Sequence, residues 1–201
     1  MEQLSPLERI ENYRRRMKMP AHLHYEDGWL TGTWFLGFRY KKANDYYGGY
    51  QGNLLKRINA VWPDRQRTLH LFAGKVDTTL FPGDTLDIRT DLSQPPTYPV
   101  NAETCEGVPL HLYDFILADP PYSKEHAKKH GTPLPDSGKV TAALGNGVRP
   151  GTRLLWLDWD RPTYRGPEHA YPQWHIDTAI TIIGSCNHHI RVLFGFVRLP
   201  H

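Results

Sequence analysis

The chain has 201 residues, which is room for one domain or for one domain with a short extension. Apolar residues make up 39% and charged residues 22%, a balance that excludes a wholly disordered chain. With 17 glycines and 17 prolines, a bundle of long helices is also excluded. The net charge of +3 permits nucleic acid as a partner without arguing for it.

Membrane insertion and secretion are not expected. No stretch approaches the roughly 18 apolar residues of a membrane span. Met1 to Arg16 are rich in charge and lack the apolar run of a secretory signal. The two cysteines, Cys105 and Cys186, are too few for a disulfide framework or a four-cysteine zinc site, and we expect small buried residues there. These features favour the cytoplasm.

The N-terminal part, residues 1–50, is predicted to be a helix and an aromatic arm packed on a core of residues 51–201. Ser5 to Lys18 has apolar residues at helical spacing. Its basic end is either a solvated helix face or a phosphate-contacting patch. Residues 21–50 are dense in Gly, Trp and Tyr, which is typical of a wrapped, partly buried arm or an aromatic platform.

The core begins with a predicted short helix, Asn53 to Trp62, and then changes to short apolar strands. The expected strands are Thr68–Phe72, Thr85–Ile88, Tyr98–Ala102, Phe115–Ala118 and Arg153–Leu157, with a helix at Lys139–Leu144 and a final hairpin of Thr178–Ile183 and Ile190–Val197. Strands that are apolar on both faces belong in a covered, mostly parallel sheet. The expected fold is therefore α/β, with one antiparallel strand added by the C-terminal hairpin.

Ligands of open α/β sheets bind outside the carboxyl ends of the strands, so the residues that follow each strand are the candidates for chemistry. The most specific group is Asp119-Pro120-Pro121-Tyr122, directly after an apolar strand. Two prolines fix a rigid turn and remove backbone N–H donors. A carboxylate beside carbonyl acceptors is complementary to an exocyclic amine, and the tyrosine supplies a flat face for stacking. Together these are what a flipped-out adenine requires.

This corner and its preceding strand, residues 115–122, resemble motif IV of the amino-group methyltransferases that use S-adenosylmethionine (SAM). Asp at the first motif position is similar to the adenine-N6 branch more than to the cytosine-N4 branch. Residues 69–74 resemble the family's motif I, Tyr47-Gly48-Gly49-Tyr50 resembles the motif that closes over the methionine end, and residues 147–152 resemble the turn into the fifth strand. The resemblance covers roughly residues 45 to 199 and implies a Rossmann-like class I methyltransferase fold.

The resemblance also implies roles for individual residues. Asp119 and the Pro120 carbonyl would hold the target amine, with Pro121 completing the turn and Tyr122 stacking on the base. The SAM-binding residues would be Tyr47, Gly48, Gly49, Phe72, Ala73, Gly74, Asp87, Asn101 and Ala102. Among these, Asp87 would bind the ribose hydroxyls, and Asn101-Ala102 would lie near the cofactor's adenine. No metal is needed.

Two departures from the family pattern have consequences for the fold. Motif I lacks its second glycine, because Lys75 and Val76 follow Gly74. Only 12 residues separate Gly74 from Asp87, so we expect the first crossover helix to be missing or one turn long. No room remains for a target-recognition domain. Sequence reading would then depend on loops, a homodimer or a partner subunit.

Other polar groups leave alternatives open. Lys124, Lys128, Lys129 and His130 lie directly after motif IV, either as a solvated helix face or as phosphate contacts. Asp158 either caps the edge of the core or has a substrate role. The histidine pairs lack a third ligand in sight, so a metal site is not expected. These pairs are His22 and His24, His126 and His130, and His188 and His189.

The sequence therefore predicts a SAM-dependent methyltransferase acting on the N6 amino group of adenine in nucleic acid, with DNA favoured over RNA. Methylation of cytosine N4 is one alternative. The other is a catalytically weak, methyltransferase-like subunit that binds nucleic acid, which the altered glycine turn suggests. The recognition sequence, strandedness and biological role do not follow from the sequence.

Overall fold

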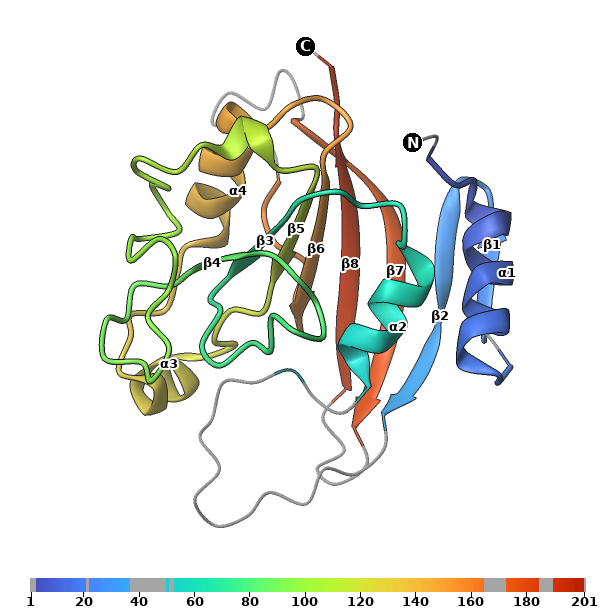
Figure 1. Cartoon of the computed structure of the whole chain (residues 1–201), viewed down its shortest axis with the longest axis horizontal. Coiled ribbons are helices and arrows are strands. Elements are labelled where there is room, and N and C mark those ends of the chain that lie inside the picture. Colours follow the sequence, from blue (N-terminus) through green and yellow to red (C-terminus); the bar gives the residue numbers. More distant parts are fainter. Residues whose placement is uncertain are drawn as a thin grey trace.

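The computed structural model describes residues 3–20, 22–36, 50, 53–164, 173–184 and 190–200. The strands in this part are β1 (Leu23–Glu26), β2 (Trp29–Leu36), β3 (Thr68–Leu71), β4 (Asp84–Leu86), β5 (Phe115–Ala118), β6 (Arg153–Asp158), β7 (Trp174–Gly184) and β8 (Ile190–Arg198). The helices are α1 (Pro6–Met17), α2 (Leu54–Val61), α3 (Lys124–His130), α4 (Ser137–Gly147) and the short 3₁₀ helix η1 (Leu110–Leu112). Figure 1 shows their arrangement around a central sheet.

The strands form an eight-stranded sheet in the order β1-β2-β7-β8-β6-β5-β3-β4. Strands β2 to β7 run in one direction, whereas β1 and β8 run against them. β8 pairs antiparallel with both β6 and β7. The predicted mostly parallel sheet with a C-terminal antiparallel hairpin strand is therefore confirmed.

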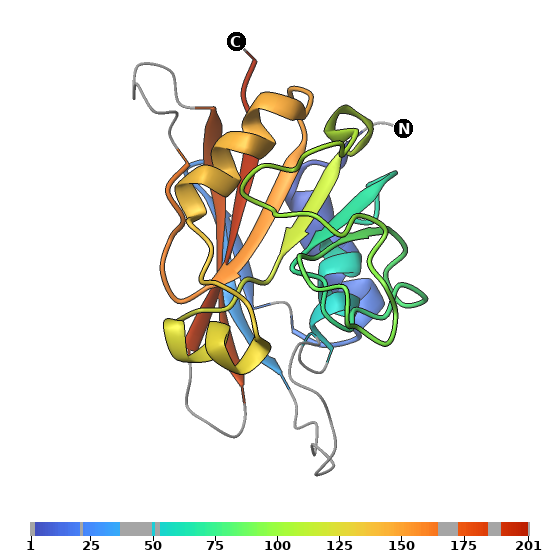
Figure 2. The same ribbon diagram turned by 90° about the vertical axis from the view of Figure 1, so that its left-hand side faces the viewer.

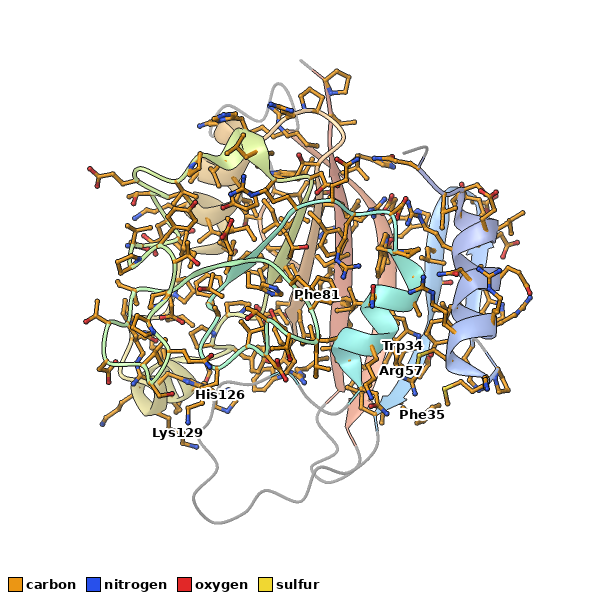
Figure 3. The ribbon with its side chains drawn as sticks, viewed as in Figure 1. Trp34, Phe35, Arg57, Phe81, His126 and Lys129 are labelled. Atoms are coloured by element: carbon orange, nitrogen blue, oxygen red, sulfur yellow. The ribbon has the colours of Figure 1, made fainter. Side chains whose placement is uncertain are left out.

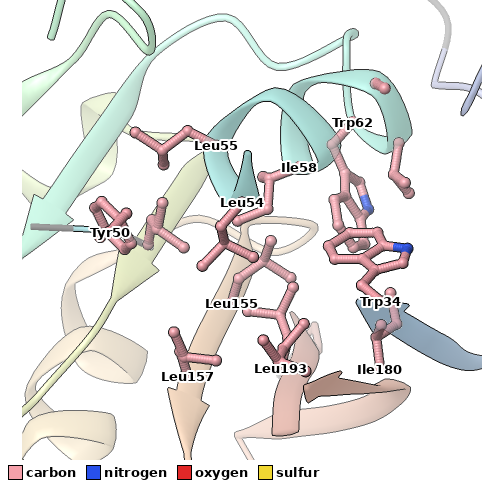
Figure 4. Close-up of a cluster of buried hydrophobic side chains, with 14 of the residues drawn as sticks. Trp34, Tyr50, Leu54, Leu55, Ile58, Trp62, Leu155, Leu157, Ile180 and Leu193 are labelled. Carbon is pink, nitrogen blue, oxygen red and sulfur yellow. The ribbon is translucent and has the colours of Figure 1, made fainter. Parts of the chain in front are cut away.

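Both faces of the sheet are covered, as the continuous apolar strands predict. Phe115 and Leu117 of β5 point into one hydrophobic core, and the alternate residues Ile116 and Ala118 point into the other. Figure 2 shows α1 and α2 on one side of the sheet and α3 and α4 on the opposite side. Figure 4 shows the first of these cores, in which side chains of α2 meet those of the sheet.

Helix α1 is fixed to the rest of the molecule by a buried ion pair. A capping box of Ser5 and Glu8 begins the helix. One turn later, Arg9 donates from both Nη atoms to the two carboxylate oxygens of Asp64, each at 2.7 Å. Tyr13 stacks on the buried Trp34 with ring centroids 5.6 Å apart. Trp34 is therefore a packing residue, and α1 belongs to the core layer of α2.

The expectation of an aromatic arm over residues 21–50 is wrong for residues 22–36. Those residues form the β1–β2 hairpin, and β2 pairs parallel with β7 to extend the sheet. Asp27 and Gly28 join the two strands with φ of 49° and 83°, which matches a type I′ turn. Residues 37–49 lie outside the described part of the chain.

The expected strand Tyr98–Ala102 does not form. Tyr98 makes one bridge to Leu86, and Pro99 follows, whose missing N–H stops a ladder from continuing. The connection from β3 to β4 contains turns and no helix, which confirms the prediction of a missing crossover helix. The remaining expected strands are present, and the predicted helix at 139–144 is the middle of the longer α4.

Candidate active site

The predicted catalytic residues 119–122 and the predicted cofactor residues 72–74 and Asp87 lie at the carboxyl-terminal edge of the sheet. Strands β3, β4, β5 and β6 are parallel neighbours, so the residues that follow them lie along the same edge. Helix α3 begins two residues after Tyr122 and lies at this edge, at the lower left of Figure 1. Because β8 is antiparallel, its first residues also reach this edge.

Asp119 is held in a three-residue polar cluster with Tyr122 and Arg191. The Tyr122 hydroxyl donates to Oδ1 of Asp119, and Nη1 of Arg191 donates to the Tyr122 hydroxyl. Nη1 of Arg191 also lies 3.6 Å from Oδ1 of Asp119. Oδ2 of Asp119 accepts no hydrogen bond from the described residues, so the carboxylate keeps one oxygen available for a ligand.

Burial determines the electrostatics of this cluster. The Asp119 side chain is 18% exposed and that of Arg191 is 9% exposed. Burial raises the pKa of Asp119, and the Arg191 charge and the Tyr122 hydrogen bond act against that rise. Burial also raises the pKa of Tyr122 well above its ordinary value, with a further contribution from the Asp119 charge. Tyr122 is therefore a neutral hydrogen-bond donor at physiological pH.

Arg191 is a residue that sequence reasoning missed. It is the second residue of β8 and contacts Tyr122 across 69 positions of sequence. Its signal is available in hindsight: a cation that begins an antiparallel strand must lie at the carboxyl end of the parallel neighbours.

The ring of Tyr122 already carries aromatic neighbours. Trp159 stacks on it with centroids 5.5 Å apart and an interplanar angle of 23°. His126 of α3 meets the same ring edge-on at 5.6 Å. Trp159 is 40% exposed, and the backbone N–H of Trp159 donates to Asp158 at 2.6 Å. A base stacking on Tyr122 would therefore either replace Trp159 or join the other face of the ring.

The predicted cofactor loop is tied to the end of β4. The carboxylate of Asp87 accepts from the backbone N–H of Gly74 at Oδ2 and from that of Arg89 at Oδ1, each at 2.9 Å. Ala73 N–H donates to the Leu86 carbonyl at 3.2 Å. Phe72 has φ of 55°, a left-handed conformation that is uncommon for a bulky residue and that turns the chain sharply after β3. Asp87 thus shapes the loop of which Gly74 is part.

His130 lies within electrostatic reach of both Asp119 and Asp87, the residues that follow β5 and β4. The pKa of His130 is lowered by burial and by nearby cations, and Asp119 and Asp87 both act against that change. Phe72 also contacts Trp156 of β6 edge-on at 6.1 Å, next to the strand that carries Asp119. The two halves of the predicted site therefore share one region.

In the described part of the chain, the other predicted cofactor residues form no hydrogen bond with Asp87 or Gly74. Asn101 is exposed, and its side chain accepts from the backbone N–H of Glu103 at 2.9 Å, whereas Ala102 is buried in the core. Tyr47, Gly48 and Gly49 lie outside the described residues. Tyr50 is buried, and burial together with the Asp119 charge raises its pKa well above the ordinary value. Tyr50 is therefore within electrostatic reach of Asp119.

The candidate phosphate contacts lie on α3. Lys124, Lys128 and Lys129 are exposed, and His130 is half-buried. Figure 3 shows Lys129 and His126 at the outer end of this edge. A Ser123 cap begins the helix and Gly131 ends it, so the basic residues are presented on a defined helix next to Tyr122.

Three further observations concern predicted or excluded chemistry. Cys105 is buried, as predicted, and burial raises its pKa to about 12, so it is an unreactive thiol. In the described ranges, no three His, Cys, Asp or Glu side chains are grouped as a metal site would need. None of the helices described here has the length and apolar character that crossing a bilayer demands. Cys186, His188 and His189 lie outside the described residues.

Comparison with known proteins gives structural likenesses alone. No family model matches the chain, and no curated protein matches it significantly. TrmN from Thermus thermophilus is similar over 73% of this chain and 48% of its own, with a TM-score of 0.51 and 18% identity. This chain thus spans about half the length of TrmN.

Two other solved structures are more distant. The N-methyltransferase NodS from Bradyrhizobium japonicum has a TM-score of 0.43 and 12% identity, over 68% of this chain and 87% of NodS. SAM-bound CalS10, an amino pentose methyltransferase from Micromonospora echinaspora, has a TM-score of 0.35 and 14% identity, over 74% and 75%. At these identities a likeness concerns the fold. The strand order, the strand directions and the likeness to TrmN establish that the chain has a Rossmann-like class I methyltransferase fold.

Proposed function

We propose that this chain transfers a methyl group from SAM to the N6 amino group of adenine in nucleic acid, with DNA favoured over RNA. The observation that carries the proposal is Asp119, which directly follows strand β5 and has Oδ1 fixed by Tyr122 and Arg191. Its Oδ2 accepts no hydrogen bond from the described residues. An ordered acceptor at the carboxyl edge of this fold is what an amine with two N–H donors needs.

The chain's own residues orient the amine and stabilise charge. Asp119 accepts one N–H of the amine and the carbonyl of Pro120 accepts the other, which leaves the nitrogen lone pair pointing away from both acceptors. As the new N–C bond formed and the bond between the methyl group and the donor sulfur broke, positive charge would develop on that nitrogen, and the ionised carboxylate would stabilise it. The surplus proton would then leave from the N–H that Asp119 accepts. Arg191 and Tyr122 hold the carboxylate in place. A neutral Tyr122 contributes its ring and its hydroxyl without competing as a base.

The loop after β3 fits SAM in its chemistry. Bound SAM supplies a methyl group activated by a sulfonium centre. Phe72 and Gly74 are both left-handed in φ, at 55° and 51°, and so bring the backbone around sharply at the strand end. Each carboxylate oxygen of Asp87 accepts one backbone hydrogen bond and retains a lone pair for a ribose hydroxyl.

The basic helix α3 supports nucleic acid as the substrate. Its exposed lysines lie beside the catalytic corner, where the backbone of a substrate strand would pass. Target recognition would come from loops, from a homodimer or from a partner subunit. Cytosine N4 is the alternative base, because cytosine presents the same amine chemistry. The connection between β3 and β4 is short and lacks a crossover helix. For this reason a binding protein is the second alternative: a weakly catalytic subunit that binds nucleic acid.

Cofactor binding separates the enzyme from the binding subunit. We expect SAM at 100 times a micromolar Kd to stabilise the protein by about 2.7 kcal/mol. For a chain of this size, that corresponds to a rise in Tm of about 5–10 °C. Adenosine and methionine, added separately, are the matched control. No shift in Tm with millimolar SAM would favour the binding subunit.

The base is identified by mass spectrometry of nucleosides after incubation with SAM and a mixture of DNA and RNA. We expect N6-methyldeoxyadenosine as the main product. N4-methylcytosine would establish the alternative base, and N6-methyladenosine in the RNA fraction alone would reassign the substrate. No methylated nucleoside, despite a SAM-dependent rise in Tm, would contradict nucleic acid as the acceptor.

A further inference from the structure

Arg191 has a donor that the cluster with Asp119 and Tyr122 does not use. Nη1 makes the contacts with both residues. Nη2 is buried and has no hydrogen-bond partner among the described residues. Nη2 is bonded to the same guanidinium carbon as Nη1, the atom that lies 3.6 Å from Oδ1 of Asp119.

Two other largely buried arginines pair both of their Nη atoms, whereas Nε of the buried Arg57 resembles Nη2 of Arg191 in having no partner among the described residues. Arg9 uses both Nη atoms on Asp64, at 2.7 Å each. Arg153 likewise uses both on Asp177, at 2.8 Å each. A charged N–H that is buried without a partner costs folding free energy, because its hydrogen bonds to water are lost. At a candidate binding site, such a group is available to donate to a ligand.

We propose that Arg191 is a specificity-determining residue whose Nη2 donates a hydrogen bond to the ring nitrogen next to the target amine. This inference rests on the proposed methylation of a base amine. The acceptor Oδ2 of Asp119 and the donor Nη2 of Arg191 together match an amine with an adjacent ring acceptor. Adenine offers that pair, with N6 between N1 and N7. An aliphatic amine has no such acceptor and would leave Arg191 unpaired.

The aromatic cover of the cluster suggests how the base enters. Trp159 stacks on Tyr122, whose hydroxyl binds Nη1 of Arg191. Trp159 is also 40% exposed, so its ring borders solvent on one side and the cluster on the other. In this proposal the base displaces the Trp159 ring, stacks on Tyr122 in its place and gives Nη2 its acceptor.

Arg191→Lys separates the role of the Nη2 donor from the role of the positive charge beside Asp119. Lysine keeps a cation beside Asp119 but loses the second, planar nitrogen. The substrates are random-sequence single-stranded DNA pools made with deoxyadenosine, 7-deazadeoxyadenosine or 1-deazadeoxyadenosine. Each analogue keeps the 6-amino group and lacks one ring nitrogen. Arg153→Lys is the matched control. Arg153 forms a similarly buried ion pair with Asp177 but begins β6, at the sheet edge opposite the site, so this variant measures the general effects of replacing arginine by lysine.

The wild-type protein should lose about tenfold or more in kcat/KM on one of the two analogues, as expected for a lost hydrogen bond to a charged group. The Arg191→Lys variant should methylate the same analogue and deoxyadenosine at rates within about threefold of each other. Arg153→Lys should keep the wild-type ratio.

Wild-type protein that treats all three pools alike, or an Arg191→Lys variant with the wild-type ratio, would overturn the inference and leave Arg191 as a counter-ion of Asp119. Lack of methylation of any pool, with SAM still bound in calorimetry, would overturn the proposed function and this inference with it. A variant that does not fold would be replaced by Arg191→Gln, which keeps a planar donor and should keep part of the discrimination.

Discussion

Replacement of Asp119 by asparagine is expected to lower kcat/KM for methyl transfer by about two to three orders of magnitude, while SAM affinity changes little. Asparagine is nearly isosteric and keeps one acceptor oxygen for the Tyr122 hydroxyl, so the fold should persist. It removes the negative charge that stabilises the aminium nitrogen, and its amide NH₂ opposes the donors of the substrate amine. Single-turnover kinetics with saturating SAM measure this effect on the chemical step.

Asp177→Asn is the matched control for this variant. Asp177 of β7 also forms a largely buried ion pair with an arginine, Arg153 of β6, across the intervening strand β8, and its side chain is 23% exposed against 18% for Asp119. Arg153, its partner, begins β6 and so lies at the sheet edge opposite the site. Asp177→Asn should lower Tm without changing the rate of transfer. Equal rates for wild-type and Asp119→Asn proteins would remove Asp119 from the mechanism.

The same carboxylate sets the direction of the pH dependence. Burial raises the pKa of Asp119 in the folded protein, and the ionised form is the one that accepts from the amine. Activity should therefore be complete above that raised pKa and fall as the pH drops through it, starting at a higher pH than for an exposed aspartate. Asp119→Asn should remove this acid limb from its residual activity. An unchanged acid limb in the variant would assign the titration to another group.

Replacement of Asp87 by alanine is expected to weaken SAM binding by about 10- to 100-fold. The variant removes the Asp87 acceptor of the partly buried backbone N–H groups of Gly74 and Arg89, and the loss of such a hydrogen bond costs about 1 kcal/mol or more for each group. Binding of SAM must then order the loop, and each 1.4 kcal/mol of binding free energy that ordering consumes lowers the affinity tenfold. Isothermal titration calorimetry measures the change.

Asp91→Ala is the control in the same segment. Asp91 pairs with Arg89 at 2.7 Å, but its side chain is 71% exposed, and exposed pairs contribute about 0–1 kcal/mol. SAM affinity should stay within about threefold of wild type in this control. An Asp87→Ala variant that binds SAM as well as Asp91→Ala does would show that the loop after β3 is not the cofactor site.

The parts of the fold that could be predicted from sequence are those governed by local pattern. Continuous apolar runs at β5 and β6 indicate strands covered on both faces, and the structure buries them on both faces. The twelve residues between Gly74 and Asp87 exclude a full crossover helix by chain length alone. Neither inference depends on knowing which segments meet in space.

The predictions that the structure contradicts fall where composition obscures the alternation of a strand or where a single proline or turn pair decides the local structure. In β2, Leu30, Trp34 and Leu36 are buried at even spacing, but the density of Gly and aromatic residues favoured an arm. The Asp27-Gly28 pair was the available signal for a hairpin. Pro99, in the middle of the expected strand 98–102, was the signal against that strand.

In the candidate site, too, some residues could be predicted from local sequence and others could not. The Asp119 corner could be predicted because its four residues are contiguous and follow a strand. Arg191 and Trp159 could not, because their contacts with Tyr122 depend on where β8 and the end of β6 lie in the folded sheet. The start of an antiparallel strand indicates that Arg191 lies at this edge of the sheet, but the local sequence does not indicate which side chain it contacts.

A bisubstrate compound gives the most direct measurement of whether one site holds both an adenine amine and SAM. In this compound the N6 of an adenine nucleoside is joined by a short linker to the methyl-bearing position of a SAM analogue. Calorimetry should give a Kd at least about 100-fold below that of S-adenosylhomocysteine, and Asp119→Asn should remove most of the gain. A compound that binds no more tightly than S-adenosylhomocysteine, or equally well to the Asp119→Asn variant, would contradict this placement of amine and cofactor.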